Sequence, residues 1–98
     1  MWYVLDDNGE PVKAASPLDG VRAFADPRRI VAQQDFCNDI HVSTVFLVID
    51  HSHGFGPPLL FETMIFGGKH DQDQWRYTSR ADAIAGHEAA ITLVLADP

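Results

Sequence analysis

The sequence is poor in three features that often point directly to a function: cysteine, positive charge and long apolar runs. Its one cysteine, Cys37, cannot form an internal disulfide, which fits a reducing compartment. Seven Lys and Arg against fourteen Asp and Glu give a net charge of -7. This charge repels the phosphate backbone of nucleic acids and anionic lipid surfaces. We therefore expect no direct contact with nucleic acid.

No apolar run approaches the roughly 20 residues of a membrane span, and the N-terminus lacks the basic and apolar regions of a signal peptide. These absences predict a cytoplasmic protein without a membrane partner. The 98 residues, 46% of them apolar, suffice for one core but not for two. We expect residues 1–98 to form a single domain.

Turn residues divide the chain into segments typical of strands and helices. Asn8-Gly9 is typical of a tight hairpin turn. Ser16 with Asp19 and Ser79 with Asp82 form capping boxes, which predict a short helix that ends before Pro27 and a long helix that runs to about residue 96. The segments with strand-like composition are 2–5, 12–13, 30–36, 40–49, 59–66 and 75–78.

This order contains no strand–helix–strand unit of the kind that builds a parallel sheet. It predicts an α+β fold, with an antiparallel sheet of about four to five strands, a long C-terminal helix packed on one face and a short N-terminal helix. Residues 40–49 are apolar on both alternating faces from Thr44 onward, which predicts a central strand covered on both sides and paired with 59–66.

Polar residues with metal-ligand chemistry occur in two predicted loops. Asp50, His51 and His53 follow the central strand, and the segment His70–Asp73 follows the next one. Imidazole and carboxylate groups are ligands that zinc accepts, but this spacing is not diagnostic. We interpret both segments as polar loops, and expect no bound metal and no cofactor.

Glu62 lies within an otherwise apolar strand, so its carboxylate needs a partner. The candidate partners of this carboxylate are Arg76, Tyr77 and His51. Pairing of Val48 with Glu62 would place Asp50 on the face of Glu62, whereas pairing of Leu47 would place His51 there, and either arrangement allows Glu62 to act as a general base.

His87 falls in the centre of the apolar stripe of the long predicted helix, which comprises Ala83, Ile84, His87, Ala90, Ile91, Val94 and Leu95. A core histidine with a satisfied hydrogen bond is the simpler interpretation. A functional imidazole would need a polar partner from the sheet, such as Glu62, His41 or Ser43.

The segment Gly54–Pro58 combines two glycines, one aromatic residue and two prolines. Phe55 either folds under its own loop or is presented as an anchor for a partner. The candidate binding residues are Asp50, His51, His53, Phe55, Glu62, His70, Asp71 and Asp73.

Five segments carry a resemblance: 42–47 (VSTVFL), 50–51 (DH), 56–68 (GPPLLFETMIFGG), 76–79 (RYTS) and 86–87 (GH). They resemble a set of small uncharacterised proteins of bacteriophages and prophage-bearing bacteria, over about the C-terminal two thirds of the chain. The resemblance implies no reaction. It implies a setting in the cytoplasm of a bacterial host, where small acidic phage proteins often disable host machinery, as anti-CRISPR proteins do.

Two hypotheses follow. In the first, the chain is an accessory protein without catalytic residues that binds a host protein, one that itself handles nucleic acid, and thereby inhibits host defence. In the alternative, Asp50, His51, Glu62 and His87 surround a pocket at one end of the sheet and form a small enzyme or ligand-binding module. The alternative requires these four side chains to converge on one cavity, whereas binding requires only an exposed patch.

Overall fold

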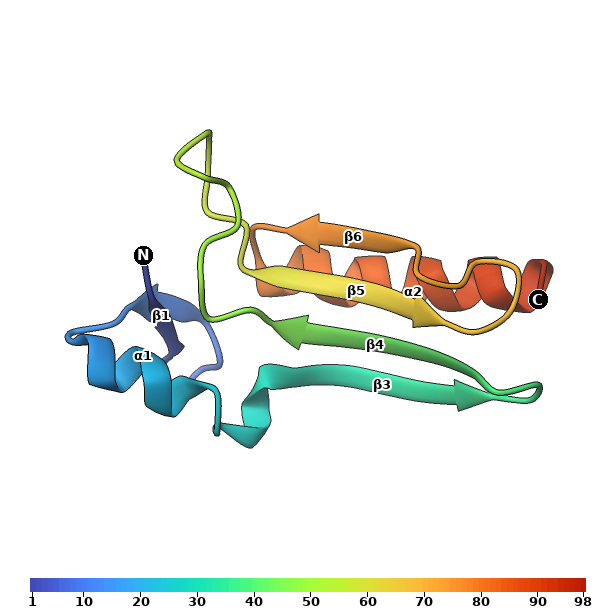
Figure 1. Cartoon of the computed structure of the whole chain (residues 1–98), viewed down its shortest axis with the longest axis horizontal. Helices are drawn as coiled ribbons and strands as arrows, with labels where there is room; N and C mark the ends of the chain where they lie inside the picture. The colour runs from blue at the N-terminus through green and yellow to red at the C-terminus, as the bar shows by residue number, and fades with distance from the viewer.

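A computed structural model of residues 1–98 shows a four-stranded antiparallel sheet with one long helix along one face and a small hairpin-and-helix unit at one end (Figure 1). The α+β prediction is therefore confirmed. The elements are β1 (Tyr3–Leu5), β2 (Pro11–Lys13), α1 (Pro17–Ala23), the 3-10 helix η1 (Pro27–Arg29), β3 (Ile30–Phe36), β4 (Ile40–Phe46), β5 (Phe61–Phe66), β6 (Gln74–Tyr77) and α2 (Arg80–Ala96).

The strand order of the main sheet is β3-β4-β5-β6, and every neighbouring pair is antiparallel. Residues 40–49 and 59–66 thus contribute adjacent antiparallel strands, as predicted. Val45 lies opposite Glu62, and Glu62 lies opposite Arg76. Neither of the two registers considered for Glu62 occurs.

β4 ends at Phe46, three residues before the predicted end of the strand. Val48 is fully buried with a φ of 69°, a conformation that β-branched residues rarely adopt and that turns the chain out of the sheet. Its carbonyl accepts a 2.7 Å hydrogen bond from the Tyr3 N–H, and Ile49 bridges to Trp2. The last residues of the predicted strand therefore pair with the start of the β1–β2 hairpin and do not continue β4.

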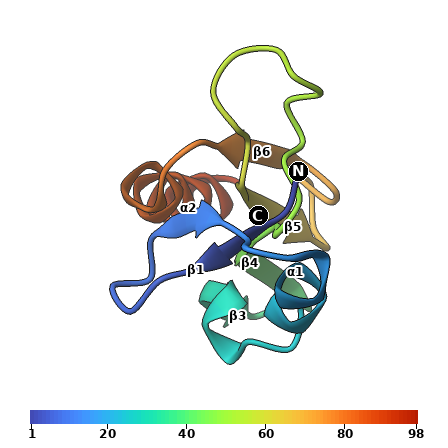
Figure 2. The ribbon, with the colours of Figure 1, turned by 90° about the vertical axis from the view of Figure 1, so that its left-hand side faces the viewer.

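α2 packs on one face of the sheet, and the end-on view shows it on one side of the strands (Figure 2). It buries Ala83, His87, Ala90 and Val94. The central strand is not covered on both sides, because no α-helix packs along the face that carries the half-buried Val45. That part of the prediction is wrong.

Ile84 and Leu95 belong to the predicted apolar stripe but are 43% and 65% exposed. One helix is about 10 Å wide and spans roughly two strands at their spacing of about 4.8 Å. The flanks of α2 therefore lie over the outer strands without a second helix beside them.

Both helix starts follow the predicted capping chemistry. The Ser16 hydroxyl accepts the Asp19 N–H at 3.3 Å, and the Ser79 hydroxyl accepts the Asp82 N–H at 3.1 Å. Neither α1 nor α2 has the length and apolar character needed to cross a membrane.

Candidate protein-binding surfaces

The loop between β4 and β5, residues 50–59, is closed at its base by the Asp50 carboxylate. Oδ1 accepts the N–H of Ser52 at 2.7 Å and of Leu59 at 3.0 Å, and Oδ2 accepts the Ser52 hydroxyl at 2.9 Å. The N–H of Ser52 is the largest of the influences that hold the pKa of Asp50 below its usual range. The carboxylate of this predicted binding residue thus joins the two stems of the loop.

Phe55 stands at the tip of this loop and is 84% exposed. The loop projects away from the sheet (Figure 1). Gly54 and Gly56 flank the ring with φ values of 82° and 75°, and a Cβ on either glycine would meet no atom within 4 Å. Of the two predicted states of Phe55, the structure shows the presented one, with a large apolar side chain left to solvent.

The two histidines of this loop that were predicted as binding residues have different surroundings. His53 is exposed with a φ of 56°, and His51 is half-buried, its backbone N–H donating to the Leu59 carbonyl at 3.0 Å. Both belong to the loop 50–59, close in sequence to Phe55.

The second predicted loop lies at the other end of the sheet, because β4 and β5 run in opposite directions (Figure 1). His70 Nδ1 is 3.4 Å from Asp73 Oδ2, and His70 Nε2 is 3.8 Å from Asp97 Oδ2. Asp71 Oδ1 accepts the Gly67 N–H at 2.7 Å and so shapes the turn.

The two histidine segments considered as a zinc site are therefore separated by the length of the strands. No group of three or more His, Cys, Asp or Glu side chains is placed to hold a metal ion.

Glu62 has one of its predicted partners. Its Oε2 accepts a 3.0 Å hydrogen bond from Arg76 Nε on the adjacent strand. The pair lies on the sheet face opposite to α2, with the Glu62 side chain 16% exposed. A charged partner explains how a carboxylate is accommodated on an otherwise apolar strand.

His87 is buried in the core, where its Nδ1 is 2.7 Å from the Thr44 hydroxyl. Thr44 is in turn 2.6 Å from the Thr63 hydroxyl, and both threonines are fully buried. Burial lowers the pKa of His87, because a charged ring is poorly solvated there. The hydrogen-bond partner of His87 is thus Thr44. It is none of the three predicted partners, which were Glu62, His41 and Ser43.

The four residues of the alternative hypothesis do not converge. Glu62 and His87 lie on opposite faces of the sheet, while Asp50 and His51 belong to the loop at its end. None of the four lines any pocket of the molecule.

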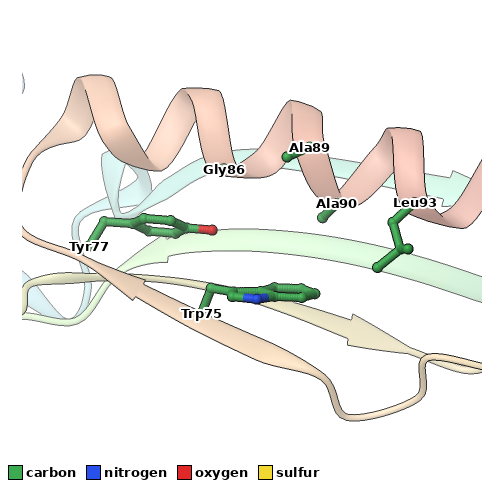
Figure 3. Close-up of a pocket in the computed structure, with 6 residues that line it drawn as sticks. All are labelled: Trp75, Tyr77, Gly86, Ala89, Ala90 and Leu93. Atoms are coloured by element: carbon green, nitrogen blue, oxygen red, sulfur yellow. The ribbon is translucent and has the colours of Figure 1, made fainter.

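An apolar groove lies between β6 and α2 and was not predicted from the sequence (Figure 3). Its volume is about 410 Å³, and its lining contains no charged side chain. Figure 3 shows the rings of Trp75 and Tyr77 extending from β6 beneath the helix. The lining residues are Trp75, Tyr77, Gly86, Ala89, Ala90 and Leu93.

Gly86 permits this arrangement. A Cβ at this position would overlap the hydroxyl and ring of Tyr77. A glycine inside a helix usually costs stability relative to alanine, so Gly86 was a sequence signal of close approach at the helix surface.

The carboxylates are mostly free of cationic partners. Only three of the fourteen pair with Lys or Arg, in Asp26–Arg28, Glu62–Arg76 and Asp97–Lys69. The hydrogen bond from Arg28 lowers the pKa of Asp26, and that from Lys69 lowers the pKa of Asp97. Eleven carboxylates remain to produce the negative field.

Comparison of the chain with protein-family models, curated proteins and solved structures finds no match.

Proposed function

We propose that the chain is a protein-binding module that binds a partner protein through the loop 50–59, with Phe55 as the anchor residue. The observation that carries this proposal is the 84% exposure of Phe55 on a loop whose stems are joined by Asp50. A loop whose stems are already joined loses less conformational entropy on binding than an open one, and exposed aromatic rings are frequent binding hot spots.

The negative field supports the choice of partner. Eleven carboxylates without Lys or Arg partners favour association with a basic surface and accelerate it over long range. A protein that handles nucleic acid has such a surface. The resemblance to phage proteins adds the proposal that this partner belongs to the bacterial host and that binding inhibits a defence function, as an anti-CRISPR protein does.

The test is site-specific photo-crosslinking in a bacterial lysate. The photoreactive amino acid p-benzoylphenylalanine replaces Phe55 in one protein and Leu18, which is also exposed, in the control. We expect a defined crosslinked protein from position 55 and none from position 18.

Competition shows whether that crosslink is specific. Excess wild-type protein should abolish it, and excess Phe55→Ala should not, because the competitor then lacks the anchor. Equal competition by wild type and Phe55→Ala, or no crosslink from position 55, would contradict the proposal. Duplex DNA should give no gel shift with the protein at physiological salt.

A further inference from the structure

The outer edge of β6 has free backbone hydrogen-bonding groups. β6 is the last strand of the sheet. In an antiparallel pair, successive residues direct their N–H and C=O groups alternately toward the neighbouring strand and away from it. The Ile65 N–H donates to the Asp73 carbonyl at 3.0 Å, so the alternation directs the backbone of Trp75 toward β5 and the backbones of Gln74 and Arg76 outward.

The side chains of the same strand lead into the groove. Trp75 and Tyr77 lie on the face covered by α2 and form one wall, while Ala89 and Leu93 of α2 contribute to the other. A fifth strand placed beside β6 would direct every second side chain into this groove. The free backbone edge of β6 and the apolar groove beside it could therefore both be occupied by one extended polypeptide.

We propose that β6 binds an extended segment of a partner protein by β-strand addition, with alternate apolar side chains of that segment in the groove between β6 and α2. Backbone hydrogen bonds to Gln74 and Arg76 give affinity, and the groove selects side chains. The inference rests on the proposed function only in that the occupant belongs to a partner protein.

Charge specifies the segment further. No Lys or Arg lines the groove, and the Arg76 guanidinium is held by Glu62 on the opposite face. Asp73 precedes β6, and Asp82 lies in the first turn of α2, after the other end of the strand. The guanidinium of Arg80, which lies between that end and Asp82 in the chain, is directed to Gly9 of the hairpin. The expected segment is thus apolar at alternate positions and flanked by Lys or Arg.

A second copy of the chain fits this edge less well. The loop 50–59 rises past β6 beyond its Tyr77 end (Figure 1). If two β6 strands paired antiparallel about a two-fold axis, the β5–β6 turn of the second copy would have to lie there. Two copies would also each bring a charge of -7. A narrow extended segment avoids both problems.

The test is selection from a random-peptide display library against the immobilised wild-type chain. We expect enriched peptides with apolar residues at alternate positions and flanking Lys or Arg. Ala89→Lys, which places a charge in the groove, should reduce their recovery at least about tenfold. Ala85→Lys, one helical turn earlier and outside the groove lining, is the matched control and should bind as wild type does.

Amide hydrogen exchange then examines the backbone. Bound peptide should protect the N–H groups of Gln74 and Arg76, which face outward in the free chain. No enrichment over the bare support, equal binding to Ala89→Lys, or unprotected amides would overturn the proposal. Peptide binding should persist in Phe55→Ala, so a failure here is distinct from a failure of the crosslink at position 55.

Discussion

His87 is the one titratable side chain that α2 buries against the sheet. Thr44 and Thr63, which face it, carry no charge, while Glu88 raises the pKa of His87 and His41 lowers it, both less than burial does. Because burial lowers this pKa, the unfolded chain takes up the proton first as the pH falls below about 6.5. The free energy of unfolding should therefore decrease between about pH 7.5 and about pH 5.5, as measured by urea denaturation.

His87→Gln should remove most of that decrease, because glutamine keeps a hydrogen bond to Thr44 without titrating. His53→Gln, at an exposed histidine, is the control and should keep the wild-type pH dependence. The carboxyl groups whose pKa is lowered, Asp26, Asp50 and Asp97, lose their contribution only at more acidic pH. An unchanged pH dependence in His87→Gln would contradict this account.

Gly86 gives a second prediction at the residue scale. Gly86→Ala gains about 1 kcal/mol in helix propensity. It also places a Cβ on the Tyr77 ring, and such overpacking costs typically about 1–3 kcal/mol. We expect a net loss of stability in a thermal melt. In a Tyr77→Ala background the overlap is absent, so Gly86→Ala should stabilise, and the same sign in both backgrounds would refute the explanation.

The partners of single residues were only partly predictable. Glu62 required a partner because it interrupts an apolar strand, and Arg76 was among the candidates. The partner of His87 could not be derived, because it depends on register. A shift of one residue exchanges the two faces of a strand, so Thr44 faces the helix and Ser43 does not.

At the scale of elements, the loop 50–59 depends on one carboxylate. Asp50→Ala removes three hydrogen bonds to a charged acceptor, which are stronger than bonds between neutral groups. We expect chymotrypsin to cleave after Phe55 several-fold faster, measured by mass spectrometry of the fragments. Asp71→Ala removes a comparable bond to Gly67 in the other loop. That control should leave the rate at Phe55 unchanged, and equal acceleration by both variants would show general loosening instead.

The elements themselves were largely predictable, because local signals determine them. Serine caps mark both helix starts, and β-branched and aromatic residues mark β4 and β5. The end of β4 was not predictable from the sequence, since the turn at Val48 is imposed by its pairing with Tyr3 of the hairpin. The groove also depends on tertiary structure: it exists because one helix covers a four-stranded sheet.

At the scale of the whole molecule, repulsion among carboxylates opposes folding. The three ion pairs with Lys or Arg contribute little to the stability of the fold, and salt weakens them. Eleven further carboxylates repel one another, and salt weakens that repulsion as well. Because the repulsive groups outnumber the pairs, added salt should stabilise the fold.

We therefore expect the urea midpoint to rise between about 20 mM and about 300 mM NaCl, because the screening length falls over this range from about 20 Å to about 6 Å. The combined variant Glu10→Gln, Glu88→Gln removes two exposed carboxylates and should show a smaller rise. Arg22→Gln, at an exposed arginine, should show a larger one, because it makes the net charge more negative. A midpoint that falls with salt in the wild type would mean that the three ion pairs outweigh the repulsion. In that case the negative field would lower the free energy of unfolding only slightly. The chain could then attract a basic partner without stabilising interactions that offset the repulsion.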